Sequence, residues 1–248
     1  MKAELLSQLV EDRRNERAVV SCTNLVTGAQ VLLYPLETTS AAAGSENSGA
    51  DASEAVGSES DATLLRAARA ALLNDRSQQV DGPEGRVFLH VHNTPLRMVL
   101  VGAVHVAQPL AKMARYAGFA VSIVDPRAVF NTEARFPGAD RHVSWPDVAL
   151  AELELNDRTA VVVLSHDPKL DDPALVAALG SPVFYIGALG SRMNQGLRLE
   201  RMKEAGFDEA DLARIRGPVG LNIGARSPAE IATAIVAEVI QRLRQDVT

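Results

Sequence analysis

The regular alternation of two kinds of segment in the C-terminal three-fifths of the chain limits the fold more than any other feature. Short runs that are almost wholly apolar predict buried strands at residues 97–102, 120–124, 160–164 and 183–186. Amphipathic segments between and after them predict helices at residues 105–117, 172–179, 192–205 and 228–244. Strands and helices in this order form a parallel sheet with helices on both faces. We therefore predict an α/β fold with a Rossmann-type parallel sheet over residues 96–248.

Residues 1–95 follow a different pattern and predict a smaller α+β domain. Apolar side chains at helical spacing predict a helix over residues 1–16. Two β-branched and apolar runs, residues 18–23 and 30–34, are joined by a segment with Asn and Gly, which predicts a hairpin.

The middle of this N-terminal part contains a segment of low hydrophobicity. Residues 37–60 are rich in Ser, Ala, Gly and Glu, and they predict a mobile loop because they have few large apolar side chains to bury. Asp61 is the expected cap of a helix that runs to about Asn74. A turn with Gly and Pro then leads into a predicted strand at residues 87–91.

Composition limits the function classes. The chain has 25 Lys and Arg against 31 Asp and Glu, a net charge of −6, so it lacks the basic character of nucleic-acid binders. No apolar run approaches the roughly 20 residues of a membrane span, and the N-terminus has no signal-peptide pattern. The single cysteine, Cys22, lies in an apolar strand, which favours an inert core thiol. We expect a cytoplasmic protein that neither binds nucleic acid nor spans a membrane.

The segment after the first predicted strand of the α/β domain resembles a dinucleotide-binding turn. Gly102 can make the tight turn, and the helix that starts at His105 offers free N–H groups to a phosphate. Val104 stands where glycine normally lets the backbone approach a pyrophosphate, which disfavours a standard NAD site. A strand-turn-helix without any ligand is the alternative.

The next strand ends at Asp125, followed by Pro126 and Arg127. An acid about 20 residues after the glycine turn accepts ribose hydroxyls in dinucleotide-binding domains. The neighbouring Arg127 is suited to a 2′-phosphate or another anion. A carboxylate that only caps the loop fits the sequence equally well.

Residues 165–173 follow the third predicted strand and carry one imidazole, one ammonium and three carboxylates. Such a set can handle protons, magnesium or an anion, and no metal ligands are assigned. His166 and Lys169 are binding candidates because no structural role accounts for them. Asp172, which precedes Pro173, is predicted to be a helix N-cap.

Two further glycine-rich loops precede helices and predict anion-binding turns. The first supplies Gly187, Gly190, Ser191 and Arg192, although Ser191 also fits an N-cap. The second supplies Gly220, Asn222 and Gly224. Ser227 and Glu230 follow it with the spacing of a capping box, which predicts a purely structural role for both.

Together, four of these motifs resemble the XdhC/CoxI family, the accessory factors of xanthine dehydrogenase and related molybdenum hydroxylases. The resemblance covers about residues 97–243, and its most specific segments are residues 102–107, 165–173, 185–192 and 217–225. Many family members have glycine in place of Val104 and aspartate in place of Asn222. The Gly-Gly-Cys signature of the N-terminal domain in longer members is missing from residues 1–95.

The resemblance implies a chaperone rather than a catalyst. It would bind molybdenum cofactor as cargo, in the molybdopterin or the dinucleotide form, and assist its maturation and its insertion into a xanthine dehydrogenase-like or CO dehydrogenase-like hydroxylase. The client apoenzyme is then a partner, and a cysteine desulfurase and a second copy of the chain are further candidates. The fold pattern alone also fits an NAD(P)-dependent oxidoreductase with His166 as acid/base, or an interaction scaffold without a small ligand.

Overall fold

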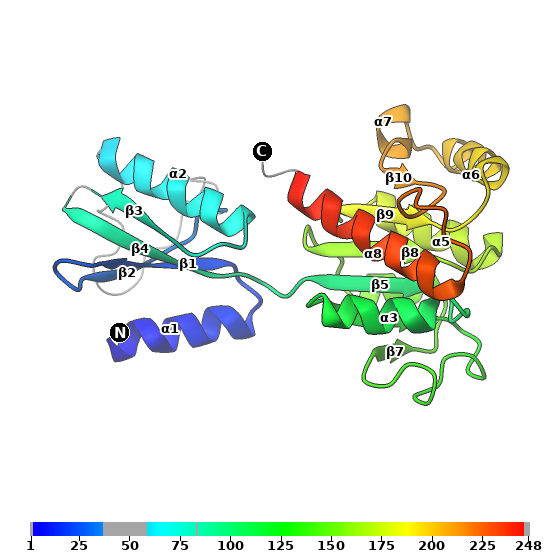
Figure 1. Cartoon of the computed structure of the whole chain (residues 1–248), viewed down its shortest axis with the longest axis horizontal. Helices are drawn as coiled ribbons and strands as arrows, with labels where there is room; N and C mark the ends of the chain where they lie inside the picture. The colour runs from blue at the N-terminus through cyan, green and yellow to red at the C-terminus, as the bar shows by residue number, and fades with distance from the viewer. Residues whose placement is uncertain (1, 37–58, 83, 246–248) are drawn as a thin grey trace, which may run out of the picture. The chain divides into compact units, whose positions relative to one another are not determined.

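The computed structural model of the chain describes residues 2–36, 59–82 and 84–245 (Figure 1). The described residues divide into two compact units, one that ends at Thr94 and one that begins at Pro95. Each unit has its own sheet and its own hydrophobic core.

The N-terminal unit is built around an antiparallel sheet with the strand order β2-β1-β4-β3. Its elements are α1 (Ala3–Arg14), β1 (Val19–Asn24), β2 (Gln30–Leu33), α2 (Glu59–Leu73), β3 (Gln78–Gly82) and β4 (Gly85–His92). Alternate side chains of β1, Val20 and Cys22, pack with Leu89 of β4 against Leu72 of α2. The predicted hairpin is confirmed, since β1 and β2 pair with Thr23 opposite Gln30.

Two features of this unit differ from the sequence prediction. The strand β3 was not predicted, because its sequence Gln-Gln-Val-Asp-Gly is mostly polar and only its pairing with β4 makes it a strand. The helix α2 begins at Glu59, so Asp61 lies inside the helix and is not its cap. Residues 37–58, most of the predicted mobile loop, lie outside the described residues.

The C-terminal unit is built around a six-stranded parallel sheet with the order β10-β9-β8-β5-β6-β7. Its strands are β5 (Arg97–Val101), β6 (Ala120–Val124), β7 (Asp140–His142), β8 (Thr159–Val163), β9 (Tyr185–Ala188) and β10 (Ile215–Arg216). Its helices are α3 (Ala107–Tyr116), α4 (Pro146–Glu152), α5 (Pro168–Leu179), α6 (Arg192–Glu204), α7 (Glu209–Leu212) and α8 (Pro228–Gln245). Counted from β5, the strand order is that of a Rossmann fold, which confirms the predicted class.

Helices cover both faces of this sheet. The helices α3 and α8 cover one face, and α5 and α6 lie on the other (Figure 1). Met98 and Leu100 of β5 join a core cluster with α3 and α8, whereas Val99 and Val101 join a second cluster with α4, α5 and α6. This alternation follows from the strand period of two. Every residue of β8 is buried, as expected of a central parallel strand.

The helix α5 corrects one prediction. It begins at Pro168 with Asp167 as its N-cap, five residues before the predicted Asp172–Pro173 start. The two Asp-Pro pairs carry the same capping signal, and the helix starts at the first, with Pro173 inside it. Four short elements, β7, α4, α7 and β10, were not predicted, because their periodic patterns are weak.

Candidate functional site

The candidate site lies at the carboxyl edge of the parallel sheet. Because all six strands run in the same direction, the loops that follow β5, β6, β8, β9 and β10 meet at one edge. The strand order reverses between β5 and β8, and Rossmann folds bind ligands beside such a switch point. Thirteen of the predicted site residues lie in these loops or in the first helical turn that follows them: Gly102, Val104, His105, Asp125, Arg127, His166, Lys169, Gly190, Ser191, Arg192, Gly220, Asn222 and Gly224.

Gly102 lies where the loops that follow β5 and β8 approach each other closely. It has a φ of +104°, which favours glycine. A Cβ atom at this position would lie 3.0 Å from both the Cβ and the backbone nitrogen of Ser165, the second residue after β8. The close approach of the two loops therefore requires a residue without a side chain.

The turn leads into an uncapped helix N-terminus. The helix α3 begins at Ala107, two residues after the predicted start, and Val106 provides no side-chain hydrogen bond to its first turn. Ala107 is fully buried, as expected for the position where helix and sheet pack closely. Val104 is half-buried against the core and His105 is exposed. In this first turn the N–H of Ala107 is bonded to the carbonyl oxygen of Val104, and Pro109 has no N–H. Gln108 is therefore the residue of the turn that can offer a backbone donor to an anion.

Asp125 is buried at the end of β6 and is bonded within the protein. It accepts hydrogen bonds from the backbone of Ala103 and from the backbone and side chain of Arg127. Burial alone would raise the pKa of Asp125, but these hydrogen bonds outweigh it and hold the pKa below its ordinary value. The carboxylate therefore ties the glycine turn to the loop after β6.

The loop after β8 holds His166 in an unusual conformation. His166 has a φ of +63° and an exposed side chain, and Lys169 is also exposed. Ser165 stabilises the loop. Its hydroxyl accepts a hydrogen bond from the N–H of Asp167 at 3.2 Å and donates one to the carboxylate of Asp171. Left-handed backbone at a residue other than glycine stores strain, which is common at ligand sites.

Beneath this loop, Asp171 of α5 faces Arg198 of α6. Burial raises the pKa of Asp171, and the hydrogen bond from Ser165 and the charge of Arg198 partly offset this effect. Burial likewise lowers the pKa of Arg198 against the opposing effect of Asp171. The guanidinium also donates to the carbonyl oxygen of Leu189 at 2.9 Å and to Gln195 at 2.7 Å. This buried network connects the loops after β8 and β9.

From the sequence, Asp171 had a role only as one of the three carboxylates in residues 165–173, and Ser165, Gln195 and Arg198 had none. A signal for Arg198 was present, because it lies four residues before the buried Met202 and therefore on the same helix face. The sequence alone does not say that an acid on another helix faces it.

Three of the predicted site residues have structural roles in the fold. Gly187 lies inside β9 rather than in the loop, and a Cβ there would lie 2.5 Å from a methyl group of Val219. Gly220 packs against α8, and its N–H donates to Glu238 at 2.7 Å. Ser191 is the N-cap of α6.

The last glycine-rich loop has both exposed and structural residues. Asn222 and Gly224 are exposed, and a Cβ at Gly224 would meet no atom within 4 Å. The predicted capping box after this loop is confirmed, since Ser227 and Glu230 exchange hydrogen bonds with each other's backbone N–H groups.

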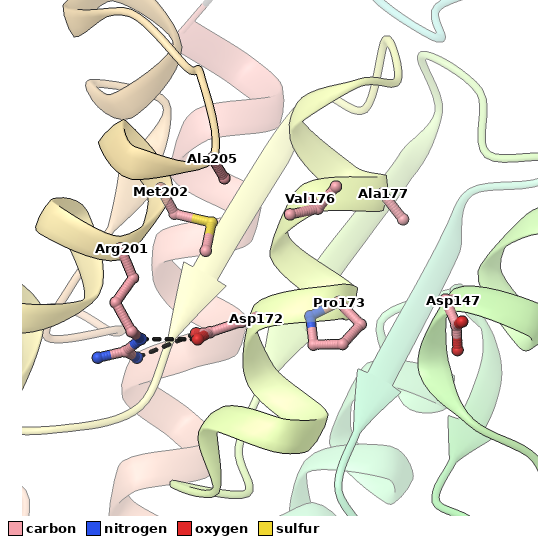
Figure 2. A pocket seen from close by; sticks show the side chains of 8 residues that line it. All are labelled: Asp147, Asp172, Pro173, Val176, Ala177, Arg201, Met202 and Ala205. Atoms are coloured by element: carbon pink, nitrogen blue, oxygen red, sulfur yellow. Dashed lines mark hydrogen bonds and ion pairs between the residues drawn. The ribbon is translucent and has the colours of Figure 1, made fainter.

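A recess of about 480 Å³ lies on one helical face of the unit, between α5, α6 and the start of α4 (Figure 2). Val176 and Met202 line it, and Arg201 forms two hydrogen bonds with Asp172 at its rim, at 2.6 and 3.0 Å. None of the predicted site residues is among the residues that line it. The position of Asp172 in this ion pair replaces its predicted role as a cap.

Within the described ranges, no group of three or more His, Cys, Asp or Glu side chains is arranged to hold a metal ion. No helix in the described part of the chain is long and apolar enough to cross a membrane.

The sheet order and the glycine turn at the switch point define a Rossmann-type domain. The chain belongs to the XdhC family, since the family model of the XdhC Rossmann domain matches residues 98–239. This match confirms the resemblance found in the sequence.

Three proteins illustrate the similarity. A Bacillus subtilis protein described as a probable subunit of xanthine dehydrogenase is 36% identical over 146 residues, which are 58% of this chain and 42% of that protein. The Escherichia coli molybdenum cofactor insertion chaperone PaoD is 37% identical over 110 residues, 44% of this chain and 35% of PaoD. The uncharacterized Escherichia coli protein YqeB is 34% identical over 157 residues, 62% of this chain and 29% of that protein. The chain thus spans less than half the length of these relatives.

A solved structure shares the fold. The crystal structure of a xanthine dehydrogenase from Bacillus halodurans matches with a TM-score of 0.66 and 24% sequence identity, over 97% of this chain and 64% of that one.

Proposed function

We propose that this protein is an accessory factor that binds molybdenum cofactor and assists its maturation and insertion into a molybdenum hydroxylase of the xanthine dehydrogenase type. The observation that carries the proposal is the XdhC Rossmann domain over residues 98–239. The 37% identity over 110 residues to a molybdenum cofactor insertion chaperone supports it. The cofactor is cargo here, and the client enzyme performs the catalysis.

The geometry of the carboxyl edge supports this function. Molybdopterin carries a terminal phosphate, and the uncapped first turn of α3, which follows the Gly102 turn, can donate the N–H of Gln108 to such a group. Lys169 and Arg192 are exposed cations in the first turns of α5 and α6, where they can add charge-assisted hydrogen bonds to the same anion. His166, held at the switch point, is suited to contact the polar edge of the pterin.

The finer details rest on the resemblance to the family. The dinucleotide form of the cargo, a cysteine desulfurase as partner, a homodimer and a cytoplasmic location stay predictions.

The experiment compares protein purified from cells that can make molybdopterin with protein from cells that cannot. Bound pterin is oxidised to its fluorescent form and quantified against protein. We expect pterin only in the preparation from competent cells. The proposal fails if that preparation is not enriched and the purified protein does not bind isolated cofactor.

A matched pair of variants tests the location of the site. Lys169→Ala removes an exposed cation from the first turn of α5, whereas Lys112→Ala removes an exposed cation from the second turn of α3. We expect Lys169→Ala to reduce bound pterin by about tenfold, the effect of one charge-assisted hydrogen bond, and Lys112→Ala to leave it unchanged. Equal effects of the two variants would place the cofactor elsewhere.

A further inference from the structure

This chain has the acidic residue that binds the ribose hydroxyls in dinucleotide-binding Rossmann domains, but the carboxylate is already hydrogen-bonded within the protein. Dinucleotide-binding domains place an Asp or Glu at the end of the second strand, where it accepts hydrogen bonds from the ribose hydroxyls of the adenosine half. Asp125 is the corresponding residue, since it directly follows β6, and β6 lies beside the strand that carries the glycine turn. Its side chain has no solvent exposure.

All acceptor positions of this carboxylate are used by the protein. Oδ1 accepts from the backbone N–H of Arg127 and from its Nε, both at 2.9 Å. Oδ2 accepts from Nη2 of Arg127 and from the backbone N–H of Ala103, both at 2.7 Å. A carboxylate offers about four lone-pair positions, so a ribose diol would have to displace existing donors.

Arg127 is held in this position by more than the carboxylate. Its guanidinium carbon lies 4.9 Å from the centre of the Phe130 ring, a cation–π distance. The hydrogen bond with Asp125, and to a lesser extent the charges of Asp125 and Asp167, raise the pKa of Arg127. The side chain is therefore a fixed part of the site, with 42% of its surface exposed.

We propose that Arg127 determines the ligand specificity of this site by exclusion: it occupies the ribose subsite on Asp125 and so prevents the binding of adenine dinucleotides. The Nε and Nη2 groups of Arg127 donate to Asp125 in place of the two ribose hydroxyls that donate to this acid in dinucleotide-binding Rossmann domains. This inference rests on the proposed function only in placing the ligand at this edge, and it explains how a Rossmann domain with an intact ribose acid avoids the abundant nicotinamide cofactors.

An arginine in this region has a different role in NADP-binding domains, where it binds the 2′-phosphate. That role needs a guanidinium whose donors face the ligand. Here the Nε–Nη2 edge of Arg127 faces Asp125, and the acid neutralises its charge. The inference therefore predicts weak binding of NADP⁺ as well as NAD⁺.

The test is a calorimetric titration of the full chain and its variants with NAD⁺, NADP⁺ and ADP-ribose. For the wild type we expect dissociation constants above about 1 mM. Arg127→Ala uncovers Asp125 and should bind NAD⁺ and ADP-ribose at least about tenfold more tightly, the effect of a hydrogen bond to a charged group. The gain should vanish with an NAD⁺ analogue that lacks the 2′-hydroxyl of the adenosine ribose.

Arg135→Ala is the matched control, because Arg135 also lies over the ring of Phe130, at 5.8 Å, and donates none of the hydrogen bonds that Asp125 accepts. It should bind nucleotides as weakly as the wild type. If Arg127→Ala does not fold, Arg127→Lys, which keeps the charge and loses the Nε–Nη2 fork, should show the same diol-dependent gain.

Micromolar binding of NAD⁺ or NADP⁺ by the wild type would overturn the inference. A folded Arg127 variant without a gain, or with a gain that persists for the deoxy analogue, would overturn it as well. These titrations contain no pterin, so their outcome is separate from that of the pterin copurification.

Discussion

The guanidinium of Arg198 and the carboxylate of Asp171 lie 3.6 Å apart, and their side chains expose only 4% and 3% of their surface. They connect the helices that follow β8 and β9, and through Ser165 and Leu189 they connect the two loops at the sheet edge. Burial of both charges without a partner would cost several kcal/mol each. The Arg198–Asp171 pair therefore helps to hold the loops after β8 and β9 in their positions at the carboxyl edge of the sheet.

The first prediction follows from this pair. Asp171→Asn leaves a buried guanidinium without its counter-charge and should lower the free energy of unfolding by about 3–5 kcal/mol. Urea unfolding followed by circular dichroism measures the change.

The control is the neighbouring ion pair at the rim of the recess (Figure 2). Asp172→Asn breaks the contact with Arg201, whose side chain is 36% exposed, and should cost at most about 1 kcal/mol. If the two variants lose equal stability, burial of the Asp171–Arg198 pair does not make its loss more costly than that of an exposed ion pair.

The second prediction concerns the switch point. Gly102→Ala puts a Cβ against Ser165 at a φ of +104°, so it adds a steric clash to backbone strain. Gly118→Ala imposes similar strain at a φ of +91° but meets no atom within 4 Å. Gly118→Ala should cost about 1 kcal/mol, and Gly102→Ala about 1–3 kcal/mol more.

Thermal and urea unfolding of the two variants test this difference. Gly102→Ala should also retain less pterin than Gly118→Ala in the copurification experiment, because the turn and the start of α3 would shift. Equal stability of the two variants would show that the loops after β5 and β8 can move apart without a loss of free energy of unfolding.

The sequence predicted the fold better than the site, for physical reasons. Buried parallel strands such as β6 are continuous apolar runs, and their bounds, Ala120–Val124, agree with the prediction. Edge strands such as β3 and β10 depend on partners that are distant in sequence, so no local pattern reveals them.

Within the candidate site, the sequence identified the loops but not the partners of their side chains. Asp125 and Arg127 were open to several roles because a sequence does not show whether two charges two residues apart face each other. The same is true of Asp172, whose N-cap signal was real but was preceded by an equivalent one at Asp167.

The third prediction is a pH dependence caused by Cys22. Burial raises the pKa of this thiol from 9.0 to about 12. The unfolded chain therefore loses the thiol proton at lower pH than the folded protein, and stability falls as pH rises from about 9 toward 12, by about 1.4 kcal/mol per unit.

Urea unfolding between pH 8 and pH 11 tests this prediction by comparison with Cys22→Ala, which lacks the thiol. The wild type should lose stability more steeply than the variant above pH 9, because the other titrating groups are common to both. Parallel curves would contradict the prediction. At pH 8, Cys22 in the folded protein should also react much more slowly with a thiol reagent than in urea.

The last prediction concerns Val104, which stands where dinucleotide-binding turns have glycine. Val104 does not have a positive φ, so a glycine would act only by removing the bulk of the side chain. The sequence alone predicts that Val104→Gly raises the affinity for nicotinamide cofactors. The bonds between Arg127 and Asp125 change that expectation, since they block the ribose subsite whatever residue occupies position 104.

We therefore expect Val104→Gly alone to bind NAD⁺ as weakly as the wild type. Combined with Arg127→Ala, it should bind NAD⁺ more tightly than Arg127→Ala alone, because both the pyrophosphate and the ribose positions would then be open. Calorimetric titration of the wild type, the two single variants and the double variant measures the coupling of the two sites. A gain for Val104→Gly equal to that of the double variant would show that Val104, not Arg127, excludes the dinucleotide.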